Sequence, residues 1–170
     1  MDRATLVERR GIQPAEQRTA ILDGYELTFD QKGIPWLEPS FANLRVAERQ
    51  SVHGVAYSLT ASQLEELDAL EGGGAYDHLE VVVRVPGGGT LSAKTYVTTD
   101  TVSGRYPSRR YMGLLLRGAQ EHELPADWIL RLKSQRTGGL KRLAFVAPVL
   151  MAAFEIFFRI QLYARRLIGR

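Results

Sequence analysis

The chain of 170 residues contains 45% hydrophobic and 24% charged residues, which is the composition of a single globular domain and excludes wholesale disorder. It has no cysteine, which excludes disulfides, thiolate chemistry and cysteine-ligated zinc and fits a reducing, cytoplasmic compartment. Three scattered histidines, His53, His78 and His122, show no metal-ligand spacing, so we expect neither a metal nor a cofactor.

The net charge of +3 is unevenly distributed along the chain. Nine basic residues and one acid lie between Arg131 and Arg170, so this segment carries +8 and the rest of the chain carries −5. A nucleic-acid-binding domain should carry its basic residues on the folded face itself, so no nucleic-acid partner is expected. The pattern instead favours a globular domain followed by a membrane-seeking tail.

Two segments alternate apolar and polar residues in the manner of half-buried strands. The first is "DGYELTFD" at 23–30 and the second is "SVHGVAYSL" at 51–59. Gly54, inside the second segment, predicts a bulge or a close backbone approach.

A short helix is predicted for "TASQLEELDALEG", residues 60–72. Thr60 or Ser62 can cap it, and Ser62 with Glu65 matches the spacing of a capping box. Leucines recur at every third residue from Leu64, so one face of the helix is apolar.

The second half of the chain predicts a hairpin followed by two helices. "HLEVVVRV" (78–85) and "TLSAKTYVT" (90–98) read as strands joined by the glycine turn "PGGG". Residues 110–134 read as two helices that break at "HELP", where Pro125 suits the first position of the second helix. Strands followed by helices favour an α+β domain with a small, mainly antiparallel sheet or barrel and flanking helices.

We expect this domain to span 1–133, a linker to span 134–142, and a C-terminal amphipathic helix to span 143–170. The uncharged stretch 143–154 is shorter than the ~20 residues that cross a bilayer. An apolar face opposite a basic face favours a helix lying on a membrane surface. A helix packed on the domain's own surface and a spanning anchor remain alternatives.

Glu71 lies at the junction between the short helix and three glycines. A carboxylate in the last helical turn faces the negative end of the helix dipole, which favours its protonated, neutral form. A general base works best when its protonated and ionised forms are both accessible at the working pH. The glycines, beginning with Gly72, let a substrate approach the backbone without meeting a Cβ. The alternative is a solvated helix end.

Two tyrosines accompany this acid. Tyr111 falls in the first turn of a helix entered through Pro107 and Ser108, and Tyr76 lies two residues beyond the glycines. For both, packing of a helix or strand onto the sheet is the alternative to a place in a binding site.

Taken in order, "GVAYSLT", "LDALEG", a nearby tyrosine, "VVVRV", "AKTYV" and "PSRRY…RGAQEHELP" resemble the γ-glutamylcyclotransferase family, from about Ala4 to about Leu132. The resemblance implies release of an amino acid from a γ-glutamyl amino acid, leaving 5-oxoproline. It also implies that Glu71 is the acid/base, and that Tyr111, Gly72 and, at a shorter spacing than usual, Tyr76 meet the substrate.

The substrate stays open between γ-glutamyl amino acids, glutathione and a γ-glutamyl-lysine amine. A different reading is an inactive relative that serves as a membrane-associated interaction module. Family members begin with a strand ending in a tyrosine–glycine–serine–asparagine loop, and Met1 stands where the last residue of that loop would be. We therefore expect the chain as written to be inactive and to expose a pairing edge.

Overall fold

The structure is a computed structural model, and it describes residues 5–70 and 76–138. Glu71 and Gly72, and the predicted tail at 143–170, lie outside these ranges. The predicted linker is described only as far as Gly138.

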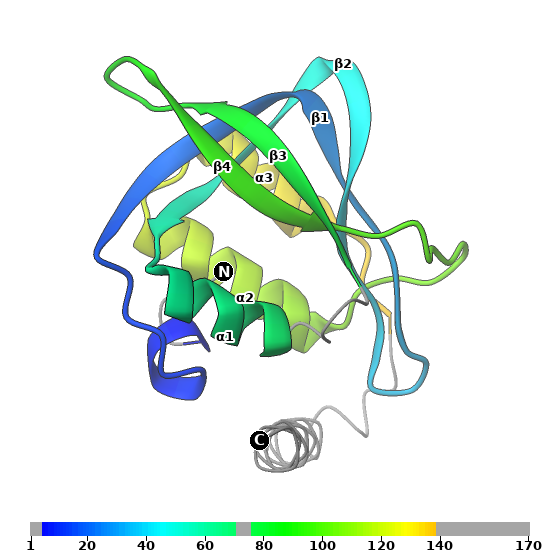
Figure 1. Cartoon of the computed structure of the whole chain (residues 1–170). Helices are drawn as coiled ribbons and strands as arrows, with labels where there is room; N and C mark the ends of the chain where they lie inside the picture. The colour runs from blue at the N-terminus through cyan, green and yellow to red at the C-terminus, as the bar shows by residue number, and fades with distance from the viewer. Residues whose placement is uncertain (1–4, 71–75, 139–170) are drawn as a thin grey trace, which may run out of the picture.

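Four antiparallel strands form one curved sheet (Figure 1). They are β1 (Glu16–Ile34), β2 (Glu38–Ser58), β3 (Asp77–Arg84) and β4 (Thr90–Val97). Their spatial order is β2-β1-β3-β4, so β2 and β4 are the two end strands. With the flanking helices, this arrangement confirms the predicted α+β class.

The long β1–β2 hairpin extends well beyond the two segments that the sequence predicted. Its register shifts between Asp23 and Tyr25, where Gly24 adopts a φ of 81°, and again between Thr28 and Gln31. Bulges of this kind bend and twist a hairpin. The prediction of a bulge or close approach at Gly54 was wrong, because Gly54 pairs regularly with Ala20 and, among the described residues other than its chain neighbours, no atom lies within 4 Å of where its Cβ would be.

The β3–β4 hairpin forms as predicted. Its turn places Gly87, Gly88 and Gly89 at φ values of 94°, 115° and 89°, which side chains rarely allow. β3 meets β1 at the pair Ile21–Arg84.

The short helix is α1 (Ala61–Leu70). Its cap is Thr60, whose Oγ1 accepts a hydrogen bond from the Gln63 amide at 3.3 Å while the Gln63 side chain accepts one from the Thr60 amide at 2.9 Å. This is the reciprocal pattern of a capping box. The capping box therefore lies two residues before the predicted pair Ser62 and Glu65, because the helix begins at Ala61 and Thr60 is the residue that precedes it.

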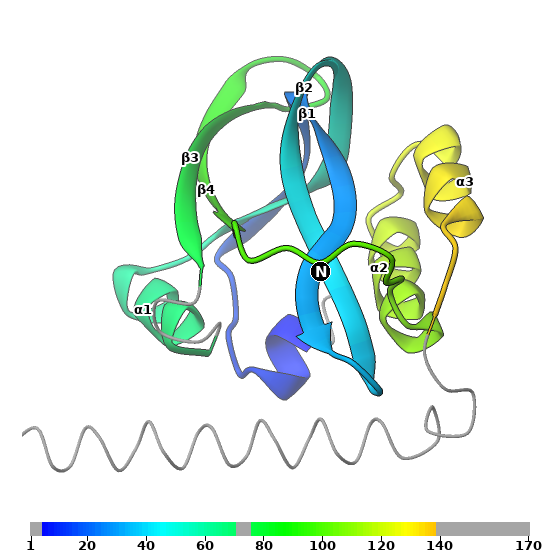
Figure 2. The same ribbon diagram turned by 90° about the vertical axis from the view of Figure 1, so that its right-hand side faces the viewer.

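Helices α2 (Arg109–Glu121) and α3 (Ala126–Ser134) pack together beside the β1–β2 hairpin, away from β3 and β4 (Figure 2). Ser108 caps α2 by accepting a hydrogen bond from the Tyr111 amide at 3.0 Å. Pro125 precedes α3 with a ψ of 142°, so it is the capping residue and not the first helical residue. A further single π-helical turn, η1 (Thr5–Arg9), precedes the sheet.

Candidate functional site

A cavity of about 820 Å³ lies within the curve of the sheet. All four strands line it, together with Leu6 of η1 and with Leu64 and Leu67 of α1. Ligand sites commonly have volumes of about 300–1,000 Å³, so a small molecule fits.

The cavity runs along the edges of the two end strands. Residues 54–59 at the end of β2 and residues 91–96 of β4 line it without interruption. Successive side chains of a strand point to opposite faces, so an unbroken run of lining residues means that the edge of the strand faces the cavity. Within the described ranges, β2 and β4 have no second strand partner on these edges.

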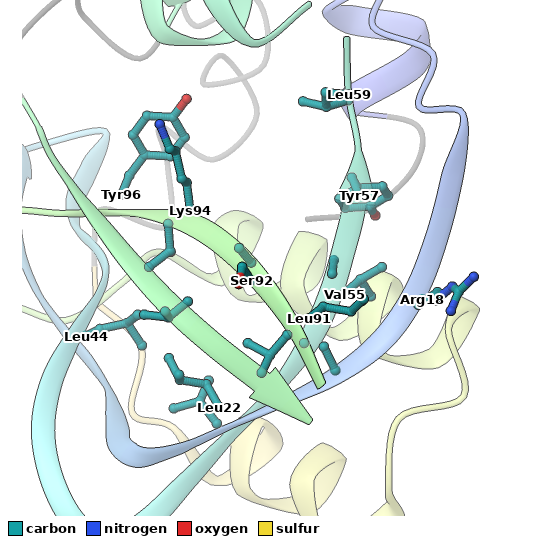
Figure 3. A pocket seen from close by; sticks show the side chains of 18 of the residues that line it. Arg18, Leu22, Leu44, Val55, Tyr57, Leu59, Leu91, Ser92, Lys94 and Tyr96 are labelled. Carbon is teal, nitrogen blue, oxygen red and sulfur yellow. The ribbon is translucent and has the colours of Figure 1, made fainter. Parts of the chain in front are cut away.

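The lining changes in character along the cavity. Leu22 and Leu44 lie toward one end, and Lys94 and Tyr96 lie side by side at the other (Figure 3). Tyr96 also reaches α1, so the polar end of the cavity is the end beside that helix. Such a site can hold an apolar body and orient a polar head group.

Three side chains from three elements meet at this polar end. Tyr96 donates a hydrogen bond to Asp68 Oδ1, and His78 Nε2 lies 3.1 Å from the same oxygen. His78 and Tyr96 are directly paired across β3 and β4, and their rings meet edge-on with centroids 5.1 Å apart. His78 and Tyr96 line the cavity, whereas Asp68 supports them from α1.

Sequence reasoning missed this cluster, although signals for it existed. Asp68 follows Leu64 by four positions, so the two residues lie on the same side of the helix. Counting back from the glycine turn places His78 opposite Tyr96.

The predicted site tyrosines contact neighbouring elements. Tyr76 accepts a hydrogen bond from Gln31 Nε2 at 2.5 Å, and its ring lies edge-on to Tyr96 with centroids 6.3 Å apart. Tyr111 accepts one from the Ala42 amide at 3.2 Å, and its ring stands at 82° to that of Phe41. Neither residue lines the cavity, so their contact with substrate stays a prediction.

Glu71 directly follows Leu70, the last residue of α1, but its side chain is outside the described residues. Its role as acid/base, like that of Gly72 in meeting the substrate, therefore stays a prediction. Among residues 5–70 and 76–138, no three acidic or histidine side chains gather where they could ligate a metal. No helix within these same ranges has the length and apolar character needed to cross a bilayer.

Comparison with known proteins places the chain among relatives of one activity. The family model described as the AIG2-like family matches residues 51–132. The γ-glutamyl cyclotransferase gliK of Aspergillus fumigatus is 30% identical over an alignment of 191 residues, gaps included. The alignment covers 87% of this chain and 68% of the relative. The chain belongs to the γ-glutamyl cyclotransferase family. The family resemblance inferred from the sequence motifs is thereby confirmed.

Other members of the γ-glutamyl cyclotransferase family give the same picture. The gliK protein of Claviceps purpurea is 32% identical over 151 residues, covering 79% of this chain and 66% of the relative. The chain thus spans just under two thirds of the length of that relative. A solved structure named γ-glutamyl cyclotransferase superposes with a TM-score of 0.68 at 23% identity, covering 84% of this chain and 92% of the other, which shows a shared fold.

Proposed function

We propose that the function of this protein is to cyclise γ-glutamyl amino acids to 5-oxoproline with release of the amino acid, and that this activity requires the N-terminal loop segment that the family resemblance implies. The observation that supports this proposal is the cavity of about 820 Å³, whose polar end adjoins α1, the helix that Glu71 directly follows. Together with membership of the γ-glutamyl cyclotransferase family, this location favours Glu71 as the acid/base of the reaction.

In the proposed reaction, the substrate's own α-amine attacks its γ-carbonyl carbon. A new C–N bond closes the five-membered ring, and the bond from the γ-carbonyl to the amino-acid nitrogen breaks. Glu71 takes one proton from the α-ammonium, which frees the amine to attack, and then gives a proton to the departing nitrogen. The ring nitrogen loses its second proton as the lactam forms, and the released amine takes up that proton to leave as an ammonium. Because the attack is intramolecular, the protein's main task is to hold the folded substrate in a reactive geometry.

Tyr111, Tyr76 and Gly72 would contact the substrate in this proposal. Tyr111 contacts β2 at Ala42, and Tyr76 contacts β1 at Gln31. Gly72 would present a backbone amide without a side chain in front of it. γ-Glutamyl amino acids are the first substrate class to test, followed by glutathione and γ-glutamyl-lysine.

Glu71→Gln tests the acid/base assignment. Formation of 5-oxoproline from γ-glutamyl-alanine should fall by about 10²–10⁴, because an amide cannot carry the proton. Glu65→Gln, an exposed change within α1, is the matched control and should leave the rate unchanged. Retention of more than about a tenth of the rate by Glu71→Gln would contradict the assignment.

The assay should use both this chain and a form that carries a relative's tyrosine–glycine–serine–asparagine segment ahead of Met1. Activity of either form on γ-glutamyl-alanine, glutathione or γ-glutamyl-lysine identifies the substrate class. Lack of 5-oxoproline with every substrate and both forms would overturn the proposal in favour of an inactive relative.

From the sequence, we also propose that segment 143–170 forms a helix that lies in the membrane interface. This helix would place a cytoplasmic enzyme at a membrane surface. The full chain should float with anionic liposomes, a chain ending at Gly139 should not, and about 0.5 M salt should weaken the binding. No flotation of the full chain would contradict this proposal.

A further inference from the structure

We propose that His78 is a substrate-contacting residue of this site, whose Nδ1 accepts a hydrogen bond from the α-ammonium of the γ-glutamyl group. Asp68 would be a positioning residue that fixes the His78 ring and its tautomer. The inference rests on the proposed function for the identity of the ligand, but the geometry that carries it belongs to the cavity itself.

The first step concerns the proton on the imidazole. Asp68 Oδ1 already accepts the hydrogen bond of the Tyr96 hydroxyl, and His78 Nε2 lies 3.1 Å from the same oxygen. A lone pair on Nε2 would be repelled by a carboxylate oxygen at this distance, so the tautomer with the hydrogen on Nε2 is favoured. In the neutral ring, Nδ1 then holds a lone pair.

The second step concerns where that lone pair lies. His78 is among the residues that line the cavity, and its Nε2 edge is engaged by Asp68. No hydrogen bond reaches Nδ1 from any residue in 5–70 or 76–138. Nδ1 is therefore the ring nitrogen that remains for a ligand.

The third step concerns rigidity. The Tyr96 ring packs edge-on against the His78 ring at an interplanar angle of 74°, and the two residues are paired across the hairpin. Asp68 holds both polar groups from α1. A side chain that is held by ring packing and by a polar contact on its other edge loses little conformational freedom when it binds a ligand.

The fourth step concerns the sign of the ligand's charge. A neutral Nδ1 acceptor backed by the Asp68 carboxylate favours a positively charged donor. Among the described residues, the other charged side chains that line the cavity are those of Lys94, Glu16 and Arg18. Lys94 lies 3.8 Å from Glu80, and Arg18 lies 3.0 Å from Glu16, so each of these charges is offset by a partner. An α-ammonium has three N–H donors, so His78 can hold one while another faces the acid that removes the proton.

Side-chain NMR of the ¹⁵N-labelled histidines at about pH 8 tests the geometry directly. His78 should show the Nε2–H tautomer, and γ-glutamyl-alanine should shift its Nδ1 resonance. His53, whose ring packs against Trp128 at 5.3 Å and does not line the cavity, is the internal control and should not respond. Asp68→Asn should remove the tautomer preference, since an amide can also donate.

Kinetics supply the second readout. His78→Phe should raise KM for γ-glutamyl-alanine by about tenfold or more, the loss expected for a hydrogen bond to a charged group. His78→Asn, which keeps an acceptor near the position of Nδ1, should recover most of this loss, whereas His78→Gln should not. His53→Phe is the control variant and should leave KM unchanged.

The outcomes separate the two proposals. Turnover by the wild type with KM unchanged in His78→Phe would overturn the role of His78 while the proposed function stands. A ligand-induced shift of the His78 resonance without formation of 5-oxoproline would support the contact between His78 and the ligand. It would contradict the proposed cyclisation. An Nδ1–H tautomer, or no shift of His78 at saturating ligand, would overturn the inference whatever the His78 variants do.

Discussion

The β1–β2 hairpin has two sides that are packed very differently. On one side, α2, α3 and the loop between them supply a cluster of buried side chains, which are Met112, Leu124, Trp128 and Leu132 with Ala119. On the other side, the buried residues are the smaller Ala20, Leu22 and Val83, and they border the cavity of about 820 Å³. Val52 packs against both clusters, so the two sides share the same hairpin.

This difference in packing indicates that the helix side of the hairpin mainly contributes stability and that the cavity side mainly contributes ligand binding. A filled cluster gains dispersion and transfer free energy from every buried methylene group. A cavity forgoes that gain and leaves room for a ligand. Changes on the helix side should therefore be measured mainly in unfolding, and changes on the cavity side mainly in binding and rate.

The largest expected effect on stability is that of Trp128→Ala. Trp128 is 5% exposed, packs within the helix-side cluster and stacks near His53 and Arg131. Its removal should lower the free energy of unfolding by about 3–5 kcal/mol, measured by urea denaturation. Trp36→Ala is the control, because Trp36 is 69% exposed and its loss should cost less than about 0.5 kcal/mol. Equal losses in the two variants would contradict the contrast between the two sides.

Two glycines of the hairpin offer a matched test of filled and open space. A Cβ at Gly33 would lie 2.0 Å from the Glu38 carbonyl oxygen, so Gly33→Ala should destabilise the fold by about 1–3 kcal/mol. Gly54 lines the cavity, and within 5–70 and 76–138 no atom outside its two chain neighbours lies within 4 Å of its Cβ position, so Gly54→Ala should be neutral or stabilise by up to about 1 kcal/mol. Thermal unfolding of both variants measures the difference, and a destabilised Gly54→Ala would show that the cavity is less open than described.

Local signals in the sequence predicted the parts of the fold that depend on local chemistry. The glycine turn fixed the β3–β4 hairpin because Gly87, Gly88 and Gly89 adopt positive φ. Ser108 capped α2 where the Pro107–Ser108 turn predicted a helix start.

The parts that depend on distant partners could not be predicted in the same way. β1 runs over Glu16–Ile34, but only its middle shows apolar alternation in the sequence. Its ends are extended because they pair with β2, and the local sequence does not predict this pairing. The meeting of Asp68, His78 and Tyr96 likewise requires the position of α1 relative to the sheet. The family motifs predict Glu71, Tyr76 and Tyr111 as site residues. The lining of the cavity indicates His78 as a further one.

Tyr111→Phe sharpens the comparison because Tyr111 joins α2 to β2. The Phe41 contact should remain, while the Ala42 amide loses its acceptor at 3.2 Å, so stability should fall by only about 1 kcal/mol. If Tyr111 also meets the substrate, KM or kcat should change several-fold for γ-glutamyl-alanine. Tyr106→Phe, which removes a hydroxyl bonded to Arg136, is the kinetic control. A change in stability with unchanged kinetics would assign Tyr111 to packing alone.

The smallest expected effect on stability concerns the ion pair between Asp23 and Arg84, at the place where the β1–β2 hairpin pairs with the β3–β4 hairpin. Arg84 donates to both carboxylate oxygens of Asp23, at 2.6 and 3.0 Å, and Ser51 donates at 2.7 Å. The Arg84 hydrogen bonds, followed by that of Ser51, lower the pKa of Asp23 from 3.8 to about 2. Because the folded pKa is the lower one, this contribution to stability is present above about pH 4 and is lost as pH falls toward 2.

A double-mutant cycle of Asp23→Asn and Arg84→Gln, measured by urea unfolding at pH 6 and at pH 2, isolates this contribution. The Asp23 side chain is 49% exposed, so solvent screening should keep the coupling at pH 6 small. The coupling should shrink at pH 2, where the carboxylate is about half protonated, and in about 1 M salt at pH 6. A coupling that is equal at the two pH values would contradict the assigned pKa, because the neutral carboxyl cannot attract Arg84 as the carboxylate does. Neither variant should alter KM, since Asp23 and Arg84 lie outside the residues that line the cavity.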